Sequence, residues 1–306
     1  MRRRRAVAAL AGAVALIVVV ALLVGGDDGE SDRAGEDRAA AAAPPELPRG
    51  GRRILPRFRL VAFYGAPQAG ELGALGIGTP DQAGRRLARQ ARTYRRPGRP
   101  VLPVFELIAV VANGSPGRDG RYRTRQGAAT IRRYLAAARR ARALLLLDIQ
   151  PGRADFLAEM RALEPFLREP DVGLALDPEW HVGAGQVPGQ VLGSVDAGVV
   201  NTVSARLAAI VRERRLPDKL LVVHQFTANM VRRKPTLARP PGVALVLDVD
   251  GFGTQAQKIA KYRELTRGGG PRFAHGLKLF FREDTDLMSP PEVLRLRPQP
   301  QLVVYE

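Results

Sequence analysis

Short apolar runs, each bounded by polar or turn-forming residues, recur along most of the chain. Eight of them have the length of a buried β-strand: Leu60–Tyr64, Val101–Glu106, Leu144–Asp148, Gly173–Asp177, Leu220–His224, Val243–Asp248, Leu277–Phe281 and Leu302–Tyr305. Several intervening segments have helical character: Asp81–Tyr94, Ile131–Arg142, Ala154–Arg168, Val195–Arg215 and Gln255–Thr266. The pattern predicts alternating strands and helices over residues 51–306.

Three segments carry the sequence pattern of a capping box, which marks a helix N-terminus: Thr79–Gln82, Thr254–Gln257 and Ser289–Glu292. Each follows an apolar run, as a βα unit requires. Eight such units in about 250 residues are typical of a closed (β/α)8 barrel of the TIM type. No glycine-rich dinucleotide-binding loop favours an open doubly wound sheet. We expect the last helix of the repeat to be absent, with residues 51–58 covering the gap.

The fourth apolar run continues into an Asp-Pro-Glu-Trp sequence that holds the only tryptophan of the chain. Because side chains alternate along a strand, Asp177 and Glu179 are expected to point the same way, with α-carbons roughly 6.5 to 7 Å apart. The small residues Gly173 and Ala175 share that face, and the intervening leucines take the other. This alternation is expected if small residues face the barrel interior and leucines meet the helices.

Residues 1–25 combine an arginine cluster with an uncharged apolar stretch, Ala6–Val24. A stretch of this length crosses one bilayer, and the positive-inside rule keeps the arginines cytoplasmic and the rest outside the cytoplasm. A cleaved signal peptide, which would release a secreted protein, is the alternative. Residues 26–50 have the composition of a disordered linker. The chain contains no cysteine, which excludes disulfides and thiolate chemistry.

The formal net charge of +18 belongs to residues 51–306, because residues 1–50 hold seven basic and seven acidic residues. A basic face held against anionic phospholipid or an anionic wall polymer would explain this excess. A compositional bias would explain it as well, since 43 of the 48 basic residues are arginine, as in proteins of high-GC genomes. Nucleic acid is not expected as a partner outside the cell.

Polar residues stand at the end of every predicted strand. They are Tyr64, Glu106, Asp148 with Gln150, Asp177 with Glu179, His224 with Gln225, Asp248 with Asp250, Glu283 with Asp284, and Tyr305 with Glu306. Active sites of such barrels lie at the carboxyl ends of the strands. Three long glycine-rich segments, Gly65–Gly78, Leu107–Arg123 and His181–Gly193, are expected to be loops that shape a cleft there.

Glycoside hydrolysis needs a protonated acid at the leaving oxygen and a second group that stabilises or attacks the sugar cation. Glu179 is the candidate general acid, because the neighbouring Asp177 carboxylate would raise its proton affinity. Trp180 would stack on a sugar ring. The remaining strand-end groups are expected to bind the substrate or stabilise its charge: Tyr64, Glu106, Asp148, Gln150, His224, Gln225, Asp248 and Asp250. This chemistry requires no cofactor and no metal.

The Asp177-Pro178-Glu179 sequence resembles the D-x-E ending of strand four in chitinase-type and some muramidase-type glycosidase barrels. That resemblance implies a glycoside-hydrolase-like barrel with Glu179 as proton donor. The chitinase pattern has two further acids where this chain has Val172 and Ala175. Residues 60–306 also resemble uncharacterised membrane-anchored envelope proteins of high-GC bacteria, in runs such as LLLDIQPGR and RPQPQLVVYE. This second resemblance implies a cell-envelope location and no particular activity.

Two other functions remain open. The barrel would serve as a non-catalytic glycan-binding or scaffold protein if it lacks catalysis. It would be a metal-dependent hydrolase if Asp148, His224, Asp248 and Asp250 bound a divalent cation. Lys278, inside the seventh apolar run, is expected to neutralise the ring of acids, and a Schiff base is the alternative.

Overall fold

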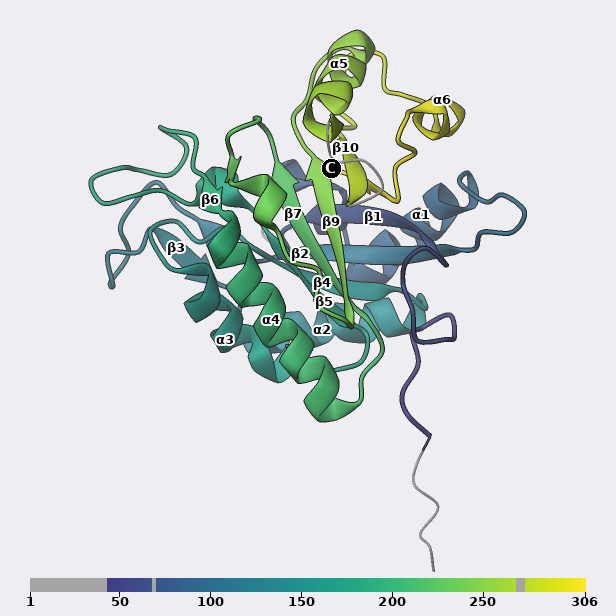
Figure 1. The fold of residues 1–306 in the computed structure, drawn as a ribbon, viewed down its shortest axis with the longest axis horizontal. Coiled ribbons are helices and arrows are strands. Elements are labelled where there is room, and N and C mark those ends of the chain that lie inside the picture. The colour runs from purple at the N-terminus through teal and green to yellow at the C-terminus, as the bar shows by residue number, and fades with distance from the viewer. Residues whose placement is uncertain (1–42, 68–69, 268–272) are drawn as a thin grey trace, which may run out of the picture. The chain divides into compact units, whose positions relative to one another are not determined.

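A computed structural model of the chain describes residues 43–67, 70–267 and 273–306. In these ranges eight parallel strands form a closed barrel in the order β1-β11-β10-β9-β7-β5-β4-β2, and β2 pairs back to β1 (Figure 1). They are β1 (Arg59–Gly65), β2 (Val101–Ala112), β4 (Leu144–Ile149), β5 (Val172–Leu176), β7 (Lys219–Gln225), β9 (Val243–Val249), β10 (Ala274–Leu279) and β11 (Leu302–Tyr305). Each matches a predicted strand, so the predicted TIM-type barrel is confirmed.

Six α-helices flank the strands in the described part of the chain: α1 (Pro80–Arg92), α2 (Ala128–Arg140), α3 (Phe156–Leu167), α4 (Ala197–Arg214), α5 (Gln255–Thr266) and α6 (Pro290–Arg295). Helices α3 and α4 lie side by side along one flank (Figure 1). Reciprocal capping boxes form at Thr79 and Thr254. At the third predicted helix start, the Glu292 carboxylate accepts a 2.8 Å hydrogen bond from the Ser289 amide. The sequence therefore identifies these helix starts correctly.

The repeat is irregular in two places. Between β7 and β9 the chain forms only β8 (Val231–Arg232), which pairs with β6 (Val195–Asp196), and the 3-10 helix η4 (Lys234–Thr236). Strand β2 is longer than predicted, because Leu107–Ala112 continues it, and its last three residues pair with β3 (Arg123–Arg125) as an antiparallel hairpin. The prediction of a loop beginning at Leu107 is therefore wrong. A register shift between Ile108 and Val110 interrupts the alternation in this extension, so that Ala109 and Val110 both pack in the outer core.

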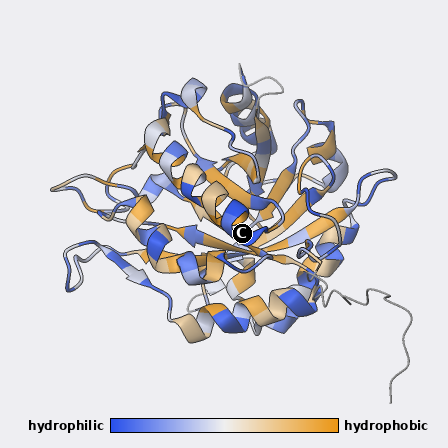
Figure 2. Ribbon diagram, turned by 60° about the horizontal axis from the view of Figure 1, so that its bottom comes forward, coloured by the Kyte–Doolittle hydropathy of each residue, from blue (hydrophilic) through white to orange (hydrophobic). Residues whose placement is uncertain are grey.

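Alternation along the strands separates an inner core from an outer one. In β5, Leu174 and Leu176 pack in the outer core against the helices, and Ala175 packs inside the barrel, as predicted. A Cβ at Gly173 would lie 2.6 Å from the Leu220 carbonyl oxygen on β7, so the close approach of these strands requires glycine. Figure 2 shows the mainly apolar strands at the centre and helices of mixed hydropathy around them.

Residues 43–58 close the end of the barrel at which the strands begin. Leu47, Ile54 and Phe58 are at most 3% exposed and pack in the inner core with the first residues of the strands. Burial of each side chain stabilises the fold by about 2 kcal/mol. The Asp218 carboxylate accepts a 3.0 Å hydrogen bond from the Ile54 amide. Arg52 donates to the carbonyl oxygens of Pro45, in the same segment, and of Arg215, at the end of α4. This segment forms a plug in the barrel end.

The plug differs from the expectation that residues 51–58 cover the place of a missing outer helix. The outer face of β11 packs instead beside the end of α1, where the Tyr94 and Tyr305 hydroxyls lie 2.6 Å apart. The predicted membrane-spanning segment lies outside the described residues. Among the residues that the structure describes, no helix is long and apolar enough to cross a membrane.

Candidate active site

Side chains from most of the strand ends converge at the open, carboxyl end of the barrel, which we call the mouth. A cavity of about 180 Å³ lies there. Six predicted site residues line it: Tyr64, Gln150, Asp177, Glu179, Trp180 and Asp250. The rest of the lining is formed by Leu72, Ile108, Phe226, Gly251, Phe252, Lys278, Phe280 and Glu306. The strand-end pattern thus correctly brings together six residues from four strand ends, those of β1, β4, β5 and β9.

A second layer of predicted site residues lies within the barrel, outside the cavity lining. Glu106, Asp148, His224 and Asp248 are at most 1% exposed. The His224 Nε2 atom is 3.0 Å from Glu106 Oε1, and its Nδ1 atom is 3.3 Å from Asp248 Oδ2 and 3.2 Å from Asp250 Oδ2. One imidazole therefore contacts three carboxylates from two strand ends, those of β2 and β9. These buried groups would therefore influence a substrate in the cavity only by their effect on the residues that line it.

Lys278 occupies the opposite side of Asp250. Its Nζ atom is 3.1 Å from Asp250 Oδ2 and 2.7 Å from Glu306 Oε2, and it lies 3.8 Å from the centre of the Tyr64 ring. Asp250 is thus held between two basic side chains. The expectation that Lys278 neutralises the acids is confirmed by these contacts.

Neighbouring groups of opposite charge determine the protonation states of His224, Lys278 and Asp250. Burial alone would lower the pKa of His224, but Glu106, Asp248 and Asp250 raise it well above its usual value. Burial opposes the charge of Lys278 too, and Asp250 and Glu306 raise the pKa of Lys278 well above normal. Burial would raise the pKa of Asp250, yet Lys278 and His224 bring it far below its usual value. At neutral pH, Asp250 is an ionised carboxylate between two cations.

Other carboxyls at the mouth hold protons more tightly. Burial, followed by repulsion from Asp148, raises the pKa of Asp177 well above its normal value. Burial also raises the pKa of Asp148 to about 7 and that of Asp248 to about 6. For Glu179, burial and then the charge of Asp250 raise the pKa. The cavity therefore combines proton-holding acids with one strongly ionised carboxylate.

The strand-four ending differs from its prediction in one respect. Strand β5 ends at Leu176, and Pro178–Trp180 form the 3-10 helix η3, for which Asp177 is the N-cap. Proline suits the first position of such a turn because its φ is fixed and it lacks an N–H. The prediction that Glu179 continues the strand is therefore wrong. So is the expectation that Asp177 is the main charge acting on Glu179, since Asp250 has that role.

A hydrogen-bonded pair connects the cavity wall to the buried layer. The Tyr64 hydroxyl donates to Asp148 Oδ2 over 3.3 Å and accepts from Gln150 Nε2 over 2.9 Å. The Gln150 Oε1 atom accepts in turn from the Ala112 amide, which fixes the orientation of the amide group. Tyr64 and Gln150 are therefore rigid polar groups on the cavity wall.

Three polar residues at strand ends belong neither to the cavity lining nor to the buried layer. Gln225 donates to the Thr227 carbonyl oxygen and accepts from Lys234, away from the lining. Asp284 is 3.3 Å from Lys258 and accepts from two backbone amides, and Glu283 is exposed. Glu306 is among the strand-end polar residues predicted from the sequence, without an assigned role in the site, and the aromatic residues Phe226, Phe252 and Phe280 were not predicted. Each of these four stands within four residues after a strand, which is the signal that identifies them.

A metal site would have to use the buried layer. Ligand atoms of Glu106, Asp148 and His224 lie within 4.8 Å of one another. A histidine ligand must offer a nitrogen lone pair, however, and His224 faces carboxylates at both nitrogens and is protonated by them. This donor set suits a buried imidazolium better than a divalent cation.

The raised carboxyl pKa values predict a pH-dependent stability. Because the folded state holds the Asp148 proton up to about pH 7, stability falls as the pH rises from about 4 to 7. His224 acts in the same direction, since its contribution is lost as the pH rises through its raised pKa. We expect D148N to be more stable than wild type by about 2 to 4 kcal/mol at pH 8, and to match it near pH 4.

Urea denaturation at both pH values measures this difference. The matched control is D286N, which removes an exposed carboxylate on the same side of the barrel and should be neutral at both pH values. Equal effects of D148N at pH 4 and pH 8 would contradict the assignment of a proton to Asp148.

No protein-family model matches the chain, and no curated protein matches it significantly. The chemistry available at the mouth is acid–base chemistry, with a partly exposed proton-holding carboxyl, an ionised carboxylate and aromatic rings around one cavity. These features are the basis for the function proposed below.

Proposed function

We propose that this barrel hydrolyses glycosidic bonds in a glycan of the cell envelope, with Glu179 as the general acid. The observation that carries the proposal is the pairing of Glu179, a partly exposed carboxyl with a raised pKa, with the ionised Asp250 in the lining of one cavity. Glycosidases use two carboxyl groups in these two states. The raised pKa of Glu179 and the lowered pKa of Asp250 correspond to these two roles.

Each group has a defined part in the reaction. Glu179 donates its proton to the glycosidic oxygen as the bond to the anomeric carbon breaks. The Asp250 carboxylate stabilises the positive charge that develops on the sugar ring. Water then supplies the hydroxyl group to the anomeric carbon, and its proton restores Glu179. Lys278 and His224 are positioning residues that keep Asp250 ionised through their 3.1 and 3.2 Å contacts.

The walls of the cavity suit a sugar. Trp180 is partly exposed beside Glu179, and the Phe252 side chain is 62% exposed. Aromatic faces of this kind pack on the apolar faces of sugar rings, and Tyr64, Gln150 and the protonated Asp177 offer hydrogen bonds to hydroxyl groups. Binding of a neutral or cationic sugar is favoured, because Asp250 and Glu306 both line the cavity.

The only tryptophan of the chain gives a direct test. Because Trp180 lines the cavity, its fluorescence reports binding at the mouth without interference from other indoles. Envelope oligosaccharides that change this fluorescence are then incubated with the protein, and new reducing ends are measured with and without EDTA. We expect at least one fluorescent binder to be cleaved at a rate that EDTA does not change.

Two other outcomes would each replace the proposal. A glycan that binds with micromolar Kd and is never cleaved would indicate a non-catalytic glycan-binding barrel. Cleavage that EDTA abolishes and a divalent cation restores would indicate a metal-dependent hydrolase built on the Glu106, Asp148 and His224 atoms.

A further inference from the structure

The two ends of the barrel differ sharply in charge. At the plugged end, residues 43–58, the turns before the strands and the described residues next to them carry thirteen arginines and four carboxylates. At the mouth, the loops after the strands carry nine basic and eleven acidic residues. We call the plugged end the basic face. The two ends therefore differ in net charge, with +9 at the basic face and -2 at the mouth.

Arginines of the basic face hydrogen-bond mainly to neutral oxygen atoms. Arg49 donates to the Arg142 carbonyl oxygen, and Arg142 donates to the Pro48 carbonyl oxygen. Arg52 donates to the carbonyl oxygens of Pro45 and Arg215. Arg96 also donates only to nearby carbonyl oxygens in the described ranges. These bonds hold the guanidinium groups in place, and none of them is made to a carboxylate.

Some arginines on the flanks of the barrel pair with carboxylates. Arg139 pairs with Asp171 and Glu169 at 2.7 Å, and Arg140 pairs with Asp81 at 2.8 Å. Others, such as Arg86, donate to carbonyl oxygens in the same way as arginines of the basic face. The basic face is distinguished by its position, because it gathers thirteen arginines at the end at which the chain enters the barrel.

Guanidinium groups of the basic face also lie close enough to repel one another. Partial burial and then the charges of Arg142 and Arg95 lower the pKa of Arg49. Burial and the charge of Arg96 likewise lower the pKa of Arg59. Such clustering is unfavourable in the isolated barrel, and phosphate groups outside the protein would relieve it.

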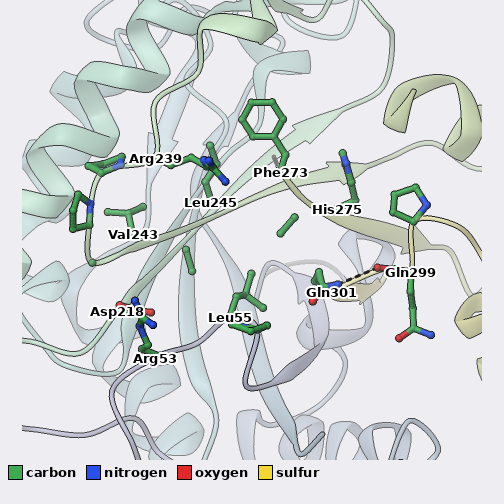
Figure 3. A pocket seen from close by; sticks show the side chains of 17 residues that line it. Arg53, Leu55, Asp218, Arg239, Val243, Leu245, Phe273, His275, Gln299 and Gln301 are labelled. Atoms are coloured by element: carbon green, nitrogen blue, oxygen red, sulfur yellow. Dashed lines mark hydrogen bonds between the residues drawn. The ribbon is translucent and has the colours of Figure 1, made fainter. Parts of the chain in front are cut away.

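The basic face contains a recess of about 670 Å³ at the beginning of β9 and β10. Arg53 and Arg239 line it, together with the apolar side chains of Leu55 and Leu245 (Figure 3). Figure 3 shows Leu55 and Leu245 toward the middle of the recess, with the arginines to one side. Asp218 also lines the recess beside Arg53, so two arginines face one carboxylate there. A recess with an excess of cationic groups and apolar walls suits the phosphate and glycerol parts of a lipid headgroup.

The chain reaches the barrel at this same face, since the plug is its first described segment. The apolar stretch Ala6–Val24 precedes the plug in the sequence. We propose that the basic face docks on anionic phospholipid headgroups of a bilayer surface, so that the mouth opens away from the membrane. Anionic lipid is favoured over a soluble wall polymer because the arginines of the basic face lie at the end at which the first described residues enter the barrel.

Hydrogen exchange of the full chain tests this orientation. The protein is incorporated into vesicles of phosphatidylcholine alone, or with roughly one third phosphatidylglycerol, a content at which surface potential attracts basic segments. We expect the anionic lipid to slow exchange at least about threefold in peptides covering residues 43–58 and 93–100, and to leave residues 177–193 unchanged. High salt should reverse the protection, because it screens exposed charges.

Two triple variants remove the same number of positive charges from different places. They test whether the protection depends on the basic face or only on the total charge of the protein. R57Q/R95Q/R96Q removes exposed arginines of the basic face, and R118Q/R121Q/R282Q removes exposed arginines of the mouth loops. Only the first should lose the protection. Both should match wild type in exchange without anionic lipid, which checks that they fold.

Three results would overturn the docking proposal. These are protection at the mouth, equal loss in both triple variants, and protection of the basic face by soluble poly(glycerol phosphate) but not by phosphatidylglycerol. The last result would identify a wall polymer as the partner. Each readout is independent of catalysis, so the proposal stands or fails apart from the proposed glycan hydrolysis.

Discussion

Replacing Glu179 with glutamine is expected to lower kcat on a cleaved glycan by about 10³-fold and to leave KM within a few-fold of wild type. An amide has nearly the same shape and hydrogen-bonding reach as the carboxyl, but it cannot transfer a proton to the leaving oxygen. Because burial and Asp250 raise the pKa of Glu179, wild-type kcat should fall as the pH rises through that raised value. The measurement is steady-state kinetics over a pH series.

The matched control for this prediction is E283Q. Glu283 is an exposed glutamate of the mouth loops that does not line the cavity, so its amide should keep full activity. D177N is a second comparison, and we expect a smaller loss because Asp177 offers a hydrogen bond rather than the transferred proton. Full activity of E179Q on a substrate that wild type cleaves would show that another group is the acid.

Replacing Lys278 with methionine is expected to lower the free energy of unfolding by about 3 to 5 kcal/mol. The Lys278 ammonium group is buried and contacts both Asp250 and Glu306, so its removal leaves the Asp250 carboxylate with His224 as its remaining basic partner. The pKa of Asp250 should then rise, and the carboxylate would lose part of its power to stabilise a sugar cation. Urea denaturation measures the stability change, and the pH profile of kcat measures the second effect.

Two further variants sharpen the Lys278 prediction. K261M removes a partly buried lysine that lies 3.9 Å from the centre of the Phe226 ring, and it should cost much less because no carboxylate loses its partner. K278M/D250N removes both charges and should recover part of the stability without recovering activity. If K278M and K261M lose equal stability, the charge pairing of Lys278 is not what stabilises the barrel.

The strands of this barrel were predictable because their signal is local. Each is a run of apolar residues bounded by turns, and burial on both faces makes such runs conspicuous. Local chemistry also marked three helix starts, at Thr79, Thr254 and Ser289. The extension of β2 to Ala112 was missed because glycines further along suggested a loop. The antiparallel partner of this extension comes from β3, a strand of three residues that carries no apolar pattern.

The positions of the site residues were also predictable in part, whereas their interactions were not. Strand ends located the cavity. Alternation alone places Gln225 on the face opposite His224, so the sequence was sufficient to exclude Gln225 from the site. The contact between His224 and Glu106 joins residues 118 positions apart and depends on the register of the closed barrel. The ionised state of Asp250 depends on the same register, because that register brings Lys278 next to Asp250. No pattern along the chain contains that information.

The plug at the closed end has a mechanical consequence. Tension on the chain before residue 43 enters the barrel through Leu47, Ile54 and the hydrogen bonds of Arg52, all at the end farthest from the cavity. Such a pull should first peel the plug out of the inner core, while the strands still hold one another through the closed ring of hydrogen bonds. The plug is therefore expected to act as a weak link that yields under load before the geometry of the mouth is disturbed.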